Sequence, residues 1–316
     1  MPRYAWGDML PFLDSNTIQN QGRGVKVALL DTGVDFTHPA LAHLNKAGHC
    51  FDASGEHLQI DNEFVTGNDA VFDNNGTSFS YHGSELAGIL AGWYVGDGDN
   101  QYLGIAPGID LYIFKVSTYD NYIGSDAYYH ALAYAVYGLD VDIICSAVYP
   151  FDSEYEKIGF GHDKYSKVFD EVERRGILYF QCLKNANLVD TILDFNFPAN
   201  QKVALKIGAM SKYLYDDFQV KSPYDYSSEI NYLLPTIDTI ICHQKESLFK
   251  LSPLSASYAT AVMAGIACII LSRDRLSAND FGLRFHSDHL RRNLKHACLP
   301  VSNVVFSLQE MYLYIP

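Results

Sequence analysis

Three polar residues of the kinds used in nucleophilic catalysis lie at the ends of predicted elements. Asp31 ends a short apolar run, and His82 and Ser257 each open a longer run of small and apolar residues. When such groups meet, the imidazole takes the proton of the hydroxyl as it attacks a carbonyl, and the carboxylate orients the imidazole. The residue types therefore predict acyl-transfer chemistry on a serine, provided that the fold brings the three side chains together.

Each of the three has an ordinary structural explanation when it is taken alone. An aspartate after a strand is usually a turn or cap residue, and a serine at a helix start is a preferred N-cap. A histidine at a helix start lies where the positive dipole end favours the neutral imidazole that a general base requires, but the small residues that follow His82 also describe an ordinary buried helix. No G-x-S-x-G surrounds Ser257, which excludes the nucleophile elbow of the α/β-hydrolases.

The elements that must position these residues alternate in type along the chain. Short apolar runs predict strands at Val25 to Leu30, Leu111 to Val116, Val141 to Val148, Ile177 to Leu183 and Val203 to Ala209. Helical spacing predicts helices at Gly83 to Trp93, Ser125 to Tyr137, His162 to Arg175, Ala259 to Leu271 and Ser287 to His296. This alternation indicates a parallel sheet covered on both faces, with ligands and catalytic groups at its carboxyl edge, where Asp31 lies.

The local strings around the three residues resemble the motifs of the subtilisin-like serine proteases (subtilases, peptidase family S8). The aspartate, histidine and serine also follow the order of that family, which differs from the order in chymotrypsin and in the α/β-hydrolases. The resemblance rests on Asp31-Thr32-Gly33-Val34-Asp35 with Thr37-His38-Pro39-Ala40-Leu41, His82-Gly83-Ser84 with Ala87-Gly88 and Ala91-Gly92, Gly104-Ile105-Ala106-Pro107, and Ser257 with Ala259, Ala264 and Gly265.

The resemblance implies a fold and a mechanism. The fold is a three-layer α/β/α sandwich with a mostly parallel sheet of about seven strands, and the mechanism is a serine endopeptidase's acyl-enzyme on Ser257. His82 would be the general base and Asp31 the orienting carboxylate. Asn185 matches the asparagine that, with the Ser257 backbone N–H, stabilises the oxyanion.

Departures from the family pattern concern the substrate cleft. The family usually has Gly-Thr before the nucleophile, where this chain has Ser255-Ala256, and proline where Ala261 stands. Lys184 replaces a glycine in the stretch that normally lines the pocket for the residue before the scissile bond. The opposite wall, usually glycine-rich, includes Ser146, Ala147 and Val148. We expect these four residues to bind substrate, with Lys184 either narrowing the pocket or favouring an acidic side chain.

Two other functions remain open on the sequence. The first is acyl transfer to an amine, as in peptide ring closure, which uses the same acyl-enzyme. The second is a catalytically silent subtilisin-like fold that binds or senses peptides, which the altered residues around Ser257 and Lys184 would suit. A complete set of Asp31, His82, Ser257 and Asn185 argues against silence.

The chain of 316 residues reads as a single peptidase domain over residues 1–316, without signal peptide or propeptide. No repeat, low-complexity tract or linker divides it. Residues 45 to 80 and 210 to 250 are weakly periodic, and we expect them to form surface excursions.

The amino-acid composition limits the classes of binding partner and the cellular compartment to be expected. The formal net charge is −14, which argues against nucleic acid and against an anionic membrane surface, and no apolar run approaches the length of a membrane span. Six cysteines without a CxxC pair indicate a reduced, cytoplasmic protein. We expect no cofactor and no metal, although Asp97, Asp99 and Asn100 form a loop whose oxygens would suit the calcium that extracellular family members often bind.

Overall fold

The protein is represented by a computed structural model. It describes residues 3–4, 20–54, 81–96, 101–117, 123–150, 162–183, 197–210, 232–235, 240–243, 248–252 and 255–279. The predicted helix at Ser287 to His296 lies outside these ranges.

Within the described residues, a seven-stranded sheet with the order β10-β9-β8-β7-β2-β6-β3 forms the centre of the fold, and every pair in it is parallel. Its strands are β2 (Lys26–Asp31), β3 (Cys50–Asp52), β6 (Asp110–Lys115), β7 (Ile143–Ser146), β8 (Leu178–Cys182), β9 (Ala204–Met210) and β10 (Tyr232–Pro235). The predicted sheet of about seven parallel strands is confirmed, and each of the five predicted strands is present.

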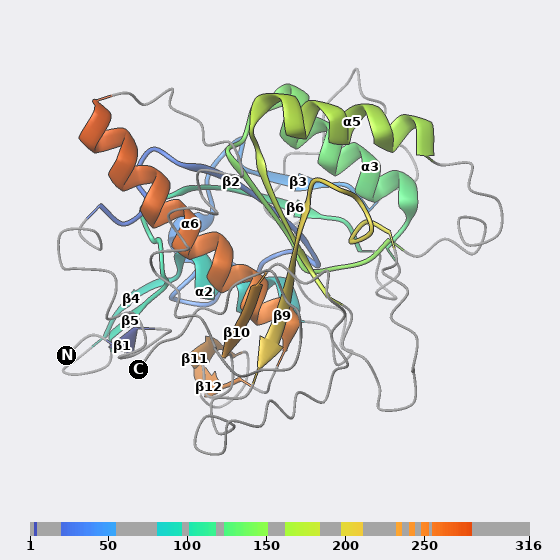
Figure 1. The fold of residues 1–316 in the computed structure, drawn as a ribbon. Coiled ribbons are helices and arrows are strands. Elements are labelled where there is room, and N and C mark those ends of the chain that lie inside the picture. The colour runs from blue at the N-terminus through green and yellow to red at the C-terminus, as the bar shows by residue number, and fades with distance from the viewer. Residues whose placement is uncertain are drawn as a thin grey trace, which may run out of the picture.

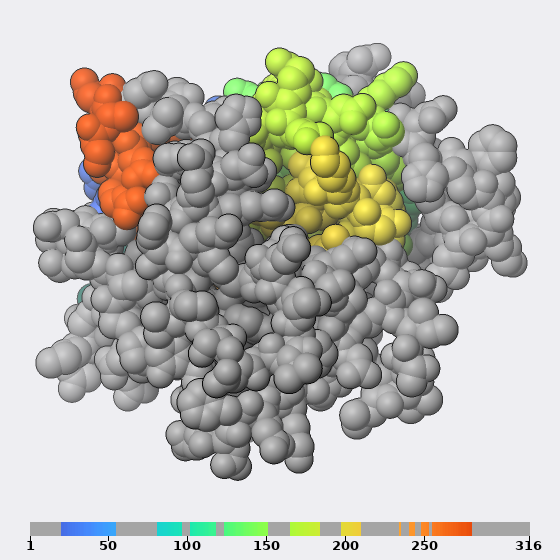
Figure 2. All heavy atoms as spheres, in the orientation of Figure 1, coloured from blue at the N-terminus to red at the C-terminus, as the bar shows by residue number. Residues whose placement is uncertain are grey.

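Helices cover both faces of the sheet, as Figure 1 shows. On one face lie α2 (His82–Ala91) and α6 (Ala256–Ala278). On the other lie α5 (His162–Arg175) and α3 (Ser125–Ala133), which continues as a π-helical turn over Tyr134–Gly138. Residues of α5 and of the segment 197–210 adjoin at the surface in Figure 2, where Lys202 pairs with Glu173. The predicted three-layer α/β/α architecture is confirmed.

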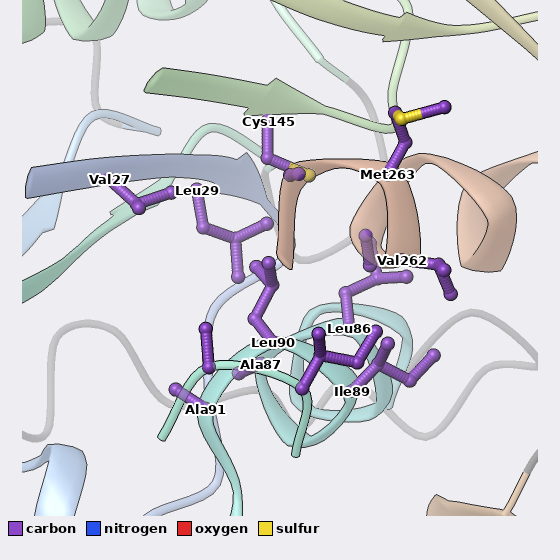
Figure 3. Packing of buried hydrophobic residues seen from close by; sticks show 14 of the residues in the cluster. Val27, Leu29, Leu86, Ala87, Ile89, Leu90, Ala91, Cys145, Val262 and Met263 are labelled. Carbon is purple, nitrogen blue, oxygen red and sulfur yellow. The ribbon is translucent and has the colours of Figure 1, made fainter. Parts of the chain in front are cut away.

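The central strand β2 is apolar on both sides because each side faces a layer of helices. Val27 and Leu29 belong to the core shared with α2 and α6, whereas Ala28 and Leu30 belong to the core shared with α3 and α5. Figure 3 shows side chains of β2, α2 and α6 directed toward one another. Burial of each large side chain contributes about 1.5–3 kcal/mol, so this packing fixes the two helices against the sheet.

The expectation that residues 45 to 80 and 210 to 250 form only surface excursions is wrong. β3 and β10 are the two edge strands of the central sheet. The strands β11 (Ile240–Cys242) and β12 (Phe249–Leu251) form an antiparallel pair. Strands of three or four residues are too short to show a period of two, which is why the sequence pattern did not reveal them.

Smaller elements complete the described part of the chain. A second sheet has the order β1-β5-β4 and is made of β1 (Arg3–Tyr4), β4 (Trp93–Val95) and β5 (Gln101–Leu103). A single 3₁₀ turn, η1, covers Ala42–Leu44.

Helix α6 is longer than the sequence pattern predicts. Its 23 residues make it long and apolar enough to cross a membrane by length and composition, which corrects the expectation that no segment approaches that length. In the fold, 94% of its most apolar window is buried, so packing against the sheet and α2 accounts for its hydropathy.

The far end of α6 is tied to the start of β2 by a buried ion pair. The Arg275 guanidinium donates to both carboxylate oxygens of Asp142, at 2.6 and 2.9 Å, and to the carbonyl of Gly24 at 2.6 Å. The Lys26 backbone N–H donates to the same carboxylate at 2.9 Å. The two charged side chains are only 4% and 5% exposed, so neither has water to replace its partner.

We expect the substitution Arg275→Met to lower the free energy of unfolding by about 3–5 kcal/mol, because it leaves the Asp142 carboxylate buried and uncompensated. Urea denaturation measures this loss. Arg273→Met, on the same helix but with a half-exposed ion pair to Asp274, is the control and should cost less than about 1 kcal/mol. Equal losses in the two variants would contradict the assignment of Arg275 as the anchor.

Candidate active site

Asp31 and His82 meet where the central strand ends and the second helix begins. The Asp31 Oδ1 atom lies 2.7 Å from His82 Nδ1 and also accepts the Thr32 backbone N–H at 2.8 Å. Asp31 is 1% exposed, whereas the His82 side chain is 15% exposed. The buried carboxylate therefore fixes which imidazole nitrogen carries the proton and leaves Nε2 for chemistry.

Two hydrogen bonds and one close backbone approach hold the start of α2 against the loop after β2. The Thr32 hydroxyl accepts the Gly83 backbone N–H at 2.9 Å, and the Ser84 hydroxyl accepts the Asp35 backbone N–H at 2.8 Å. A Cβ atom on Gly83 would lie 2.2 Å from the Gly33 carbonyl oxygen, so only glycine allows this approach. Gly83 and Ser84, which follow the histidine, thus hold His82 in contact with Asp31.

Ser257 is the second residue of α6, and its neighbour two residues earlier caps the helix. Ser255 has extended backbone angles, φ −153° and ψ 132°, and its hydroxyl accepts the Ser257 N–H at 3.2 Å. The interpretation of Ser257 as a simple N-cap serine is therefore wrong. The Ser257 hydroxyl does not cap α6, and it lies at the end of α6 nearest the sheet's carboxyl edge.

Cys182, the last residue of β8, connects Ser257 to the sheet. Burial raises the pKa of its thiol to about 12, and the charge of Asp31 acts in the same direction. Hydrogen bonds from Tyr149, Gln181 and Ser257 oppose the rise. The thiol is hydrogen-bonded to Ser257 and close enough to Asp31 to be affected by its charge, so the carboxyl ends of β2 and β8 and the start of α6 lie near one another. The apolar run that contains Cys182 predicts only a buried hydrophobic residue. Its place at the carboxyl end of a strand is the feature that could indicate a residue close to the site.

The carboxyl end of β7 lies beside those of β2 and β8. Leu30 of β2 pairs with Ser146, and Ser146 pairs with Gln181 of β8, so the three strand ends are in register. The fully buried Ser146 hydroxyl lies 2.7 Å from the hydroxyl of Tyr128 on α3. The Ser146 side chain therefore points into the interior. Ser146 is one of the predicted substrate-binding residues, and it can contact a ligand only through its backbone. Ala147 and Val148 are 6% and 8% exposed.

Tyr149 lies across the space between the ends of β7 and β8. Its hydroxyl donates to the carbonyl of Cys182, and Gln181 Nε2 donates to the Val148 carbonyl at 3.0 Å. The phenol ring therefore bridges the two segments that follow the adjacent strands. The sequence string contains this tyrosine, but its role depends on a partner 33 residues away.

The remaining predicted site residues lie outside the described ranges. These are Asn185 and Lys184, and the calcium candidates Asp97, Asp99 and Asn100. In the described part of the chain, no group of three or more His, Cys, Asp or Glu side chains is arranged to hold a metal ion.

Comparisons with known proteins identify the family of this chain. A sequence model of the subtilase family matches residues 22–298. Subtilisin DY of Bacillus licheniformis is 26% identical over 289 residues, which cover 88% of this chain and 89% of that protein. The intracellular serine protease of Paenibacillus polymyxa is 36% identical over 129 residues, 40% of this chain and 33% of that protein. The major intracellular serine protease of Bacillus subtilis (strain 168) is 34% identical over 110 residues, 34% of this chain and 28% of that protein.

We expect Gly83→Ala to separate His82 from Asp31, because the new methyl group would displace the start of α2 from Gly33. The cost in stability is about 1–3 kcal/mol, typical of overpacking. The low-field proton resonance of the His82–Asp31 hydrogen bond reports the separation in NMR spectra. Gly48→Ala is the control for destabilisation without a steric clash, since Gly48 has φ +76° but no atom within 4 Å of an added Cβ. A resonance that is unchanged in Gly83→Ala would refute the argument.

Proposed function

Since the chain belongs to the subtilase family of serine endopeptidases, we propose that it cleaves peptide bonds through an acyl-enzyme on Ser257, with His82 as general base and Asp31 as orienting carboxylate. The observation that carries this assignment is the 2.7 Å contact between Asp31 Oδ1 and His82 Nδ1 at the carboxyl edge of the sheet. A neutral imidazole held in this tautomer presents an unprotonated Nε2 to a serine hydroxyl.

In the proposed reaction, Ser257 attacks the scissile carbonyl while His82 accepts its proton. The buried Asp31 carboxylate stabilises the imidazolium that forms, and His82 then protonates the leaving amine. Asn185 and the Ser257 backbone N–H would bind the oxyanion. Water resolves the acyl-enzyme, and the mechanism uses no cofactor.

We further propose that the specificity is restricted to small side chains before the scissile bond. The pocket that the family resemblance assigns between the segments after β7 and β8 is the space that Tyr149 crosses. Its ring is anchored at the far side by the Cys182 carbonyl, so it cannot swing away without losing that hydrogen bond. Val148 adds bulk on the same wall and is itself 8% exposed.

The substrates are peptides or proteins, as expected of a protease. We propose a cytoplasmic location, supported by the five free, buried cysteines of the described ranges and by the names of the two intracellular relatives. The net charge of −14 supports the proposal that neither nucleic acid nor an anionic membrane is a partner.

A fluorophosphonate probe tests the function. We expect the protein to be labelled and Ser257→Ala to be unlabelled, with peptide hydrolysis reduced by at least about 10⁴-fold, because removal of the nucleophile leaves only binding and oxyanion stabilisation. Melting temperature checks that the variant is folded.

The same assay separates the alternatives. Absence of labelling in the folded parent protein would indicate a silent peptide-binding protein. Labelling together with ligated or cyclic products, when an amine is supplied, would indicate acyl transfer. Equal labelling of the parent and Ser257→Ala would exclude Ser257 as the nucleophile.

Peptide substrates that differ only in the residue before the scissile bond test the role of Tyr149. We expect alanine to be preferred over phenylalanine by at least about tenfold in kcat/KM, because the phenol occupies the space of a large side chain. Tyr149→Gly should open the pocket and reverse this preference.

Tyr149→Phe is the matched control, since it keeps the ring and removes only the hydroxyl. We expect it to weaken the preference for alanine without reversing it, because the ring remains but loses its anchor on the Cys182 carbonyl. A parent protein that prefers phenylalanine would refute the proposal that Tyr149 restricts the pocket.

A further inference from the structure

Glu85 is a buried carboxylate beside the site that the proposed mechanism does not use. It follows His82 by three residues on α2, which places both on neighbouring positions of one helix face. Glu85 is 5% exposed, and each of its oxygens has a partner. Oε2 accepts the hydroxyl of Tyr258 at 2.6 Å, and Oε1 lies 2.6 Å from the ammonium group of Lys250.

Tyr258 is the residue directly after the candidate nucleophile. It is 6% exposed, and its ring centroid lies 6.4 Å from that of His82, with 29° between the ring planes. Burial raises the pKa of the Tyr258 phenol well above its usual value, and the charges of Glu85 and Asp31 add to the rise. The phenol is therefore neutral and acts as the hydrogen-bond donor to Glu85.

Lys250 reaches Glu85 from the β11–β12 pair, which is fixed against α2. A Cβ atom on Gly88 of α2 would lie 2.5 Å from Cys242 Sγ of β11, which shows how closely the two elements approach. Phe249 of β12 stacks on Tyr102 with ring centroids 4.5 Å apart. The Lys250 side chain is 36% exposed, so its ammonium group keeps contact with water while it balances the charge of Glu85.

We propose that Glu85 is a positioning residue, which acts through Tyr258 to hold Ser257 in register with His82. The proposal rests on the proposed function and extends it. The link joins the first turn of the helix that carries the histidine to the first turn of the helix that carries the serine. A hydrogen bond to a charged group is about twice as strong as a neutral one, so the link resists relative sliding of the two helix ends.

The catalytic significance follows from the precision that acyl transfer requires. A misplacement of about 1 Å costs on the order of 100-fold in rate even when it arises from a residue that does not touch the substrate. Ser257 has its own hydrogen bond through Ser255, but that bond lies within α6 and does not itself set the position of α6 against α2. The Tyr258–Glu85 contact, by contrast, joins α6 directly to α2 through a side-chain hydrogen bond.

The test compares Tyr258→Phe with the parent protein in two readouts. We expect the rate constant of fluorophosphonate labelling and kcat each to fall about 10- to 100-fold, while KM for a short peptide changes less than about twofold. A role in stability alone would instead lower the melting temperature and leave the labelling rate of the folded protein unchanged.

Tyr165→Phe is the matched control, because it removes a buried phenol hydroxyl that donates to the Ser125 carbonyl on the other face of the sheet. We expect it to lower the melting temperature by a similar amount and to leave the labelling rate unchanged. Equal labelling rates for Tyr258→Phe and Tyr165→Phe would overturn the proposal.

Two further variants separate position from charge. Glu85→Gln keeps an amide oxygen that accepts the Tyr258 hydroxyl, and we expect its labelling rate to stay within about threefold of the parent rate. Glu85→Leu removes the acceptor and should match Tyr258→Phe, and the double variant should be no slower than either single variant. Additive losses would overturn the proposal.

The labelling of the parent protein separates this proposal from the proposed function. Absence of labelling in the parent would defeat the proposed function as well. Normal parent labelling with no effect of Tyr258→Phe would defeat only the role of Glu85.

Discussion

The hydrogen bond between Asp31 and His82 is the constraint on which the rest of the site depends. It requires a strand end and a helix start to meet within 2.7 Å, with the carboxylate buried. Burial of a charge is costly unless hydrogen bonds compensate it, and both His82 and the Thr32 backbone N–H bond to Oδ1 of this carboxylate. Glycine at position 83 then becomes obligatory, since any side chain there would collide with Gly33. One polar contact thus determines the residues on both sides of it.

The layered core converts that local contact into a rigid site. β2 is central in the sheet, so Asp31 is held by neighbouring strands on both sides. α2 and α6 pack on each other and share one apolar core with β2, β7 and β8. Because close-packed interiors transmit displacement, a shift of either helix moves His82 or Ser257 relative to the sheet. The Arg275–Asp142 pair at one end of α6 and the Tyr258–Glu85 contact at the other limit that shift.

The sequence predicts the parts of this structure that depend on local pattern. The continuous apolar runs of β2 and β8 identify central strands, and the motifs around Asp31 and His82 identify the pair that meets. Sequence pattern does not identify β3, β10 or the β11–β12 pair, because three- or four-residue strands carry no measurable period. The partnership of Glu85 with Tyr258 spans 173 residues and depends on tertiary packing, as does the bridge made by Tyr149. Ser255, not Ser257, caps α6, a distinction that needs backbone angles.

The cap of α6 shows how stability and chemistry share one donor. The Ser257 N–H that the proposed mechanism directs at the oxyanion donates to the Ser255 hydroxyl, at a comparatively long 3.2 Å. A neutral hydroxyl is the weaker acceptor, so in the proposed mechanism an oxyanion in the site would displace it. The charge that develops in the reaction also lies at the positive end of the α6 dipole, which favours the exchange. The bond that ends the helix in the resting protein is therefore one that the reaction can replace without unwinding the helix.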